Sequence, residues 1–265
     1  MMRALVYTAT YGAGPRQETL DSVRAQKCEG RWDYEVGWHN PYGEGVIANV
    51  TAQMERARKM AMTGGYDALL SVEHDMLIPP DALQKLWDTF SPVAYGVYLF
   101  RHGVGVLNAY EKYPSPSSNP GESLSLKPRL LARARQRQVI DVSGVGFGCT
   151  LIRREVLAKV PFRHRPTEMN GTDTIFAGDC LKSGVKQVAH FGVLCGHWNG
   201  HRWLMPFAPD DQGRVWVRAL QDVTVRIGVN SMPLRNGRDY ELPMDEVGEL
   251  ARAGYVCLAP AGGGI

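Results

Sequence analysis

Apolar runs of strand length alternate with amphipathic segments over roughly the first 110 residues of the chain. The clearest amphipathic segment spans residues 47–62, with apolar positions three and four residues apart. It ends at Gly64-Gly65, as a helix does. The strands that we expect here are 4–8, 34–38, 67–72 and 93–100, and the helices are 18–26, 47–62 and 80–90. Such alternation predicts an α/β protein with a mostly parallel central sheet and helices on both of its faces.

The pattern breaks in the middle of the chain and then resumes. Residues 113–128 are rich in Pro, Ser and Gly, which predicts a long loop. Loops of this length in compact domains are either functional lids or disordered. Residues 139–152 then regain strand character. The elements that we expect after them are helices at 153–159 and 174–182, and a strand at 187–194 leading into His197.

The last part of the chain is predicted to be a small separate unit. Its expected elements are a strand, a hairpin turn, a helix and a last strand, at 223–227, 236–237, 244–253 and 255–258. We therefore expect a main domain over residues 1–208 and a small C-terminal α+β appendage over residues 222–265.

Composition narrows the class of protein. A chain of 265 residues, 44% of them hydrophobic, can bury a core without disulfides or a structural metal. The net charge of +3 suits a protein that meets phosphate groups, but it is too small to prove a nucleic-acid partner. The five irregularly spaced cysteines indicate reduced thiols. With neither a signal-peptide pattern nor an apolar run of membrane-spanning length, we expect a cytoplasmic protein without a membrane partner.

Two carboxylates form the strongest candidate site. Glu73 and Asp75 lie two residues apart, directly after an apolar strand and before a helix that begins near Pro80. This spacing places both side chains on one side of an extended segment. Ligand sites in open α/β sheets lie beyond the carboxyl ends of the strands, and such a pair can hold a hard cation. In the alternative interpretation, both acids cap the next helix or face water.

Asp173 and His197 are the next candidates. Asp173 stands at the start of a predicted helix and could deprotonate an acceptor hydroxyl, although an acid there is more often only a helix cap. His197 follows a strand, and a neutral imidazole there could complete a site for Mn²⁺. A lone histidine is usually structural, so its assignment depends on the other two positions.

The order of these motifs resembles that of family-2-like glycosyltransferases of the Rossmann-like GT-A fold. The resemblance covers about residues 3–200. In those enzymes a strand ends in a DxD-type motif, a Gly-rich strand enters a helix, an acid-D-x-x-F element follows, and a later strand ends in a histidine. The matching segments here are Glu73-His74-Asp75, Gly144–Gly148 with Ile152–Val156, Thr172–Phe176 and His197.

The resemblance implies a metal-dependent transfer of a sugar from a nucleotide-diphosphate sugar, with a UDP-sugar favoured, to an acceptor hydroxyl with inversion. Asp75 and His197 would bind Mn²⁺ or Mg²⁺, and Glu73 would bind the donor's ribose or a metal-bound water. Asp173 would be the general base. The nucleotide base would lie against Thr8, Thr10 and Tyr11.

Two positions depart from the family's pattern. Glu73 stands where the first acid of the metal motif is usually Asp, which leaves the metal geometry less defined. Thr172 replaces the acid that usually precedes the base, which weakens the assignment of Asp173.

A basic stretch provides the prediction for the acceptor. Residues 127–137 carry five positive charges and no acid, so either they form a solvated helix face or they contact a polyanion. We expect an acceptor site that includes Arg133, Arg135, Arg137 and Trp198, although packing is an alternative role for the tryptophan. Residues 234–243 are similar to short segments of phage-encoded proteins, and phages encode glucosyltransferases that modify DNA. DNA containing hydroxymethylpyrimidine is therefore the expected acceptor, with a protein or a small molecule as the alternative.

Two other functions remain open from the sequence. A sugar-1-phosphate nucleotidyltransferase would also use carboxylates and a metal, and Gly12–Arg16 matches the G-x-G-x-R loop of such enzymes. This alternative gives His197 no role. A non-catalytic carbohydrate- or nucleic-acid-binding module on a GT-A scaffold would explain the altered motif residues.

Overall fold

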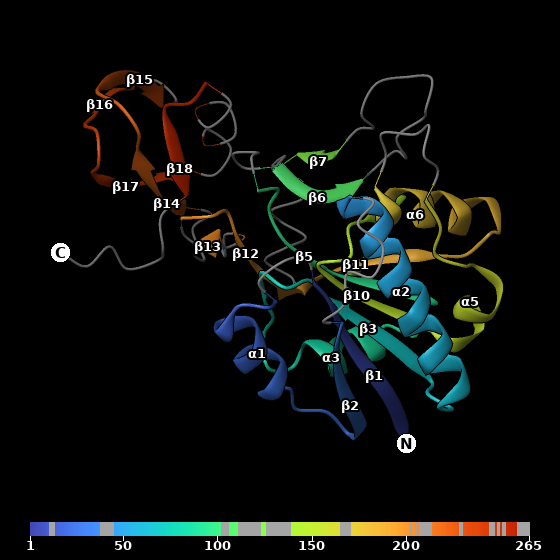
Figure 1. Ribbon diagram of the computed structural model, residues 1–265. Coiled ribbons are helices and arrows are strands. Elements are labelled where there is room, and N and C mark those ends of the chain that lie inside the picture. Colours follow the sequence, from blue (N-terminus) through green and yellow to red (C-terminus); the bar gives the residue numbers. More distant parts are fainter. Residues whose placement is uncertain are drawn as a thin grey trace.

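A seven-stranded sheet forms the centre of the protein, as the computed structural model in Figure 1 shows. Its strands, in order across the sheet, are β2 (Gly30–Gly37), β1 (Met2–Ala9), β3 (Ala68–Val72), β10 (Cys149–Arg153), β5 (Val93–Val97), β11 (Gln187–Leu194) and β8 (Val139–Asp141). The structure describes residues 1–10, 14–37, 45–101, 106–110, 123–125, 139–164, 171–201, 203–204, 206, 214–227, 230–243, 247, 250 and 253–258.

The central sheet is mixed in direction. β10 and β8 run antiparallel to their neighbours, and the remaining neighbouring strands pair in parallel. The predicted α/β class is confirmed. The apolar pattern did not reveal the two reversed strands, because a strand covered on both faces is an apolar run whichever way it points. Every residue of β3 and β5 is buried, so the core lies along these two strands.

Helices cover both faces of the sheet. They are α1 (Gln17–Arg24), α2 (Val46–Thr63), α3 (Ala82–Trp87), α5 (Arg154–Lys159) and α6 (Thr172–Lys182). In Figure 1, α2, α5 and α6 lie together on one face, and α1 and α3 lie on the other. The predicted helix at 80–90 ends early, because Phe90 adopts a left-handed φ of 54°. Among the described helices, none is both long and apolar enough to cross a membrane.

Two small sheets flank the central one. The first consists of β4 (Met76–Leu77), β12 (Gly196–Trp198) and β13 (Trp203–Leu204). The second consists of β6 (Val106–Tyr110), β7 (Ser123–Ser125) and β9 (Gly144–Val145). The run expected to be strand-like over residues 139–152 is therefore divided among β8, β9 and β10, which belong to two different sheets.

The C-terminal part forms two further antiparallel sheets. One contains β14 (Arg214–Ala219), β17 (Asp239–Pro243) and β18 (Val256–Leu258), and the other contains β15 (Val223–Ile227) and β16 (Asn230–Leu234). The turn predicted at Asn236-Gly237 is present, with the Arg238 amide donating to the Arg235 carbonyl at 3.1 Å. The hairpin prediction is wrong, because the strands on either side of this turn, β16 and β17, belong to different sheets.

The two predicted units left residues 209–221 unassigned, and β14 lies there. It pairs with β17 and β18, so it belongs structurally with the C-terminal strands. The helix expected over residues 244–253 falls mostly outside the described residues.

Candidate metal centre

Antiparallel pairing of β4 with β12 brings the two parts of the site together. In this pairing His197 stands opposite Met76, the residue after Asp75. The Trp198 amide donates to the Asp75 carbonyl at 3.0 Å, which extends the pairing by one hydrogen bond. Asp75 and His197 are 122 positions apart in sequence and become neighbours through backbone pairing alone. Glu73 joins them, since the three side chains each offer a ligand atom within 4.8 Å of the others.

His197 is oriented as a metal-binding imidazole would be. Its Nδ1 lies 2.8 Å from the Leu99 carbonyl oxygen, which can only accept a hydrogen bond. In a neutral ring Nδ1 therefore carries the proton, and the lone pair is on Nε2. That atom lies 3.6 Å from Asp75 Oδ2. A hydrogen bond from the outer nitrogen to a carbonyl is typical of histidines that ligate metals. The Tyr98 ring packs edge-on against the imidazole, with 5.4 Å between centroids.

Asp75 has one oxygen without a partner. Its side chain is only 5% exposed, and within the described structure Oδ1 is buried with no hydrogen-bond partner. Leaving a buried polar atom unsatisfied costs about 1–3 kcal/mol, and more for a charged group. A divalent cation would satisfy this oxygen, and two carboxylates with one imidazole form a suitable donor set for Mn²⁺ or Mg²⁺. The residues present therefore fit a divalent cation.

Arg101 belongs to this site and was missed by the sequence analysis. Its Nη2 donates to Asp75 Oδ2, and its Nε lies 3.4 Å from His197 Nε2. The one signal that could have found it is its position directly after the apolar run predicted as a strand at 93–100. Arginine at such a position is ordinarily assigned to the surface.

The surroundings shift the pKa values of the Asp75–His197 pair in opposite directions. Burial raises the pKa of Asp75, but the nearby His197, His74 and Arg101 outweigh it, so the pKa is lowered. Burial lowers the pKa of His197, but the nearby Asp75 carboxylate and the hydrogen bond with the Leu99 carbonyl outweigh it, so the pKa is raised. Asp75 is therefore the ionised carboxylate of the site.

Glu73 has a different electrostatic environment from Asp75. Burial, together with the neighbouring carboxylates of Asp75 and Asp173, raises its pKa to about 7. A carboxyl group with this pKa is partly protonated near neutrality and can donate a hydrogen bond as well as accept one.

Asp173 lies in a second cluster beside the metal centre. It is in the first turn of α6, where its Oδ1 accepts from the Thr174 amide at 2.8 Å. Gly171, not Asp173, is the residue at the N-cap. Burial raises the pKa of Asp173, and its charge in turn contributes to the raised pKa of Glu73. The predicted base thus lies in the same electrostatic environment as the predicted metal ligands.

Gly146 allows polar side chains to converge beside Asp173. A Cβ atom at this position would lie 3.0 Å from Asp173 Oδ2 and closer still to the Tyr98 hydroxyl and the Asn108 amide nitrogen. The Tyr98 hydroxyl accepts from Asn108 Nδ2 at 2.6 Å and from the Gly148 amide at 3.1 Å. Tyr98 and Asn108 were not among the predicted site residues, because neither stands in a motif.

The residues predicted to hold the nucleotide base lie at the carboxyl end of β1. Thr8 Oγ1 accepts from the Tyr34 hydroxyl at 3.1 Å, and the Thr10 hydroxyl donates to the Gly37 carbonyl. Both threonines are buried, and these bonds link β1 to β2. Tyr11, the third predicted residue, lies outside the described part of the chain.

Trp198 is next to His197 and is partly packed. Its ring lies 5.4 Å from that of Trp203, and the Arg16 guanidinium sits 3.8 Å from its centroid. One face of Trp198 is therefore covered by arginine. The other predicted acceptor residues, Arg133, Arg135 and Arg137, lie outside the described residues.

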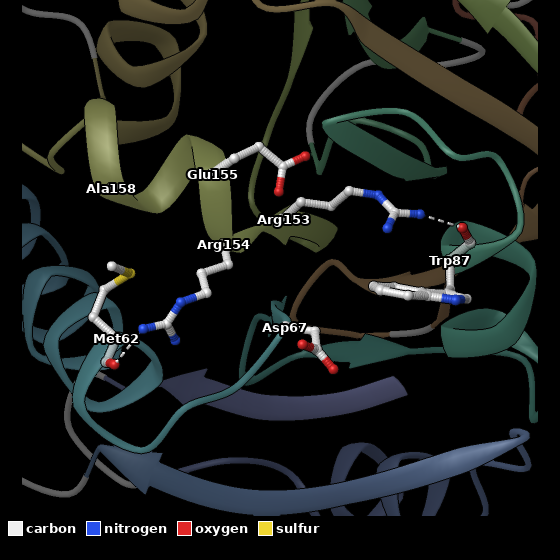
Figure 2. A pocket seen from close by; sticks show the side chains of 7 residues that line it. All are labelled: Met62, Asp67, Trp87, Arg153, Arg154, Glu155 and Ala158. Atoms are coloured by element: carbon white, nitrogen blue, oxygen red, sulfur yellow. Dashed lines mark hydrogen bonds between the residues drawn. The ribbon is translucent and has the colours of Figure 1, made fainter. Parts of the chain in front are cut away.

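A cavity of about 440 Å³ lies at the other end of the central sheet (Figure 2). It is bounded by Asp67, which precedes β3, whereas Glu73 and Asp75 follow the end of that strand. Arg153 donates to the Trp87 carbonyl at 2.6 Å, and Arg154 donates to the Met62 carbonyl at 2.9 Å. The two arginines thus satisfy carbonyl groups at the ends of α3 and α2. This cavity contains none of the predicted site residues.

Comparisons with known proteins add little to these observations. The sequence matches no protein-family model and no curated protein. Among solved structures, that of A197 from STIV is similar at 18% sequence identity, with 78% of this chain and 95% of that chain covered and a TM-score of 0.49. The function is therefore inferred from the site itself.

Proposed function

We propose that the protein is a metal-dependent glycosyltransferase of the GT-A type, which takes its sugar from a nucleotide-diphosphate donor. The observation that supports this most strongly is the buried, unpartnered Oδ1 of Asp75 beside Glu73 and His197, at the carboxyl end of a central strand. A cation bound there would give this buried carboxylate oxygen a partner. Sites at the carboxyl ends of strands are where open α/β sheets bind nucleotides.

In this proposal Asp75 and His197 hold Mn²⁺ or Mg²⁺. When bound there, the cation neutralises charge on the leaving diphosphate. Glu73 hydrogen-bonds to a ribose hydroxyl of the donor, a role that suits a carboxyl group with a pKa of about 7. Thr8 and Thr10 lie against the nucleotide base of the donor.

Asp173 acts as the general base. Its carboxylate takes the proton of the acceptor hydroxyl while that oxygen attacks the anomeric carbon, and the bond from this carbon to the diphosphate oxygen breaks. Attack from the face opposite the leaving group inverts the anomeric carbon. Burial supports this role, since it raises the pKa of Asp173 and so makes it a stronger base than an exposed carboxylate.

The acceptor in this proposal is DNA containing hydroxymethylpyrimidine. Two features support this acceptor. One is the basic stretch at residues 127–137, and the other is Trp198, which directly follows the candidate metal ligand His197. A protein or small-molecule acceptor would use the same chemistry at Asp173, so the acceptor is tested separately from the donor.

A thermal-shift screen against UDP-, GDP- and TDP-sugars, each with and without Mn²⁺, tests the proposal. A ligand at 100 times its Kd stabilises the folded state by about 2.7 kcal/mol, so the correct donor raises Tm clearly. We expect one nucleotide class, UDP first, to raise Tm in the presence of Mn²⁺ and not in EDTA. Absence of any cation-dependent shift would contradict the proposal.

Two activity assays distinguish the proposed function from its two rivals. Release of pyrophosphate from a nucleoside triphosphate and a sugar-1-phosphate would identify a nucleotidyltransferase. Donor binding without slow hydrolysis or transfer would identify a non-catalytic module.

A further inference from the structure

Arg101 contacts two of the atoms that would hold a cation, whereas Asp75 Oδ1 stays without a partner in the described part of the chain. Its guanidinium contacts Asp75 Oδ2 and lies 3.4 Å from His197 Nε2. These are the lone-pair atoms of the site that face each other, 3.6 Å apart. A cation bound to His197 Nε2 and to both oxygens of Asp75 would overlap the position of the guanidinium. Two positive groups cannot share this position, so the arginine and the cation exclude each other there.

Arg101 reaches the site from the surface. Its side chain is 41% exposed, whereas that of Asp75 is 5% exposed. The guanidinium can therefore leave without unpacking the core. In the described part of the chain, no other lysine or arginine contacts Glu73, Asp75 or His197.

The chemistry of the guanidinium indicates where it would move. Arginine has five N–H donors in a planar fork that matches the oxygens of a phosphate group. A diphosphate held beside Asp75 and His197 by a cation would lie within reach of a side chain that already touches both residues. The arginine would then exchange one carboxylate partner for phosphate oxygens, which are equally strong acceptors.

We propose that Arg101 is a latch on the cation site, which contacts Asp75 and His197 in the ligand-free protein and turns to the donor's diphosphate when the cation binds. This inference rests on the proposed function. It makes the cation and the nucleotide bind cooperatively, because the diphosphate removes the group that competes with the cation. Coupling of this kind is reciprocal between the two ligands.

The experiment measures the Kd of Mn²⁺ by isothermal titration calorimetry, with and without saturating UDP. It uses the full-length parent, Arg101→Met and a control, Arg218→Met. Arg218 has a similar exposure of 45% and also pairs with an aspartate, Asp239, but it lies in β14 and not at the candidate metal centre. Both variants lose one positive charge. Thermal unfolding of all three proteins checks that they remain folded.

Without UDP, we expect Mn²⁺ to bind Arg101→Met at least tenfold more tightly than it binds the parent or Arg218→Met. With UDP, the Kd of Mn²⁺ should fall by a larger factor in the parent than in Arg101→Met, because only the parent has a latch to release. UDP itself should bind Arg101→Met more weakly in the presence of Mn²⁺, because one phosphate contact is missing.

Other outcomes overturn the latch in distinguishable ways. Equal Kd values for Mn²⁺ in all three proteins would leave the cation site in place and remove the competition. Weaker Mn²⁺ binding to Arg101→Met alone would mean that the arginine orients the ligands instead of blocking them. No Mn²⁺ binding to any of the three would overturn both the latch and the proposed metal site.

Discussion

Asp75 and Asp173 are both partly or fully buried aspartates, yet their surroundings shift their pKa values in opposite directions. Asp75 lies beside Arg101 and His197, and its pKa is lowered. Asp173 has no such cationic partner among the groups that shift it, and burial raises its pKa. Two carboxylates whose environments separate their pKa values are suited to separate tasks. The ionised carboxylate of Asp75 is suited to bind a cation, and the more basic carboxylate of Asp173 is suited to accept a proton.

The assignment of Asp173 as base predicts the behaviour of Asp173→Asn. The asparagine oxygen can still accept from the Thr174 amide, so the first turn of α6 should stay in place. Because the amide cannot take a proton, the transfer rate should fall by about 10² to 10⁴-fold, while the Kd of the donor stays nearly constant. Steady-state transfer and donor titration measure the two quantities.

Asp179→Asn is the matched control for this change. It alters an aspartate of the same helix that pairs with Arg163 instead of facing the site. This variant should keep its rate of transfer even if it is less stable. If Asp173→Asn kept most of the parent's rate, Asp173 would have only a local structural role.

At the scale of elements, α2 fixes the end of β1 where the nucleotide is proposed to bind. Gln53 of α2 accepts from the Thr10 amide at 2.9 Å and donates to the Thr10 carbonyl at 2.5 Å. Gln53 and Thr10 are both buried. This pair of hydrogen bonds acts as a short extension of the sheet, made by a side chain where the strand has ended.

Replacing Gln53 with Leu should therefore destabilise the fold. Leucine has a similar volume but leaves the Thr10 amide without a partner, while Asn49 still lies 3.4 Å from the Thr10 carbonyl. One orphaned buried amide costs about 1–3 kcal/mol in the free energy of unfolding. Urea denaturation measures this loss as a lower midpoint at an unchanged m-value. The control is Gln17→Leu at an exposed position, which should change stability by no more than about 0.5 kcal/mol. Equal losses in both variants would contradict the role of the two hydrogen bonds between Gln53 and Thr10.

The sequence predicted the long elements better than the short ones. Elements with strong patterns, such as α2 and β11, lie where they were expected, because local periodicity reports burial. The direction of β10 was not accessible, since it depends on which neighbours the strand inserts between. The pairing of β4 with β12 was not accessible either, because two- and three-residue strands have no periodicity. Asn108 could not be predicted, because it stands in no motif and only the fold brings it to the site. Arg101 had one signal, its position directly after the apolar run at 93–100.

At the scale of the whole molecule, the C-terminal strands remain a predicted accessory unit. β14, β17 and β18 pair with one another, and in Figure 1 they lie to one side of the central sheet. A chain shortened to residues 1–208 removes all of them together and should keep donor hydrolysis. A chain ending at Gln221 keeps β14 without its partners and exposes Val217 and Ala219, which are buried in the full protein. An unpaired apolar strand promotes aggregation.

Size-exclusion chromatography and a hydrolysis assay compare these two shortened chains. We expect the 1–208 chain to elute as a single soluble species with activity, and the 1–221 chain to aggregate. If the 1–208 chain folded and yet lost hydrolysis, the C-terminal unit would belong to the active site.

The proposed DNA acceptor is also tested on the whole molecule. Phosphate contacts make binding fall steeply with salt, with a slope of about 0.9 in log Kobs against log salt for each phosphate neutralised. Gel-shift titrations on hydroxymethylated and plain duplexes should therefore give a shallower slope for an Arg133, Arg135, Arg137→Ala variant than for the parent. Identical slopes would remove the basic stretch as support for DNA, and transfer of labelled sugar to the duplex would still have to be shown.

The measurement that tests the central claim most directly is a calorimetric titration of UDP into the parent and into Asp75→Asn, each with Mn²⁺ and with EDTA. Asparagine keeps the shape of the side chain but removes the charge that the cation needs. We predict that UDP binds the parent with Mn²⁺, fails to bind it in EDTA, and fails to bind folded Asp75→Asn under either condition. Binding of UDP to Asp75→Asn with the affinity of the parent would contradict the metal site and the function built on it.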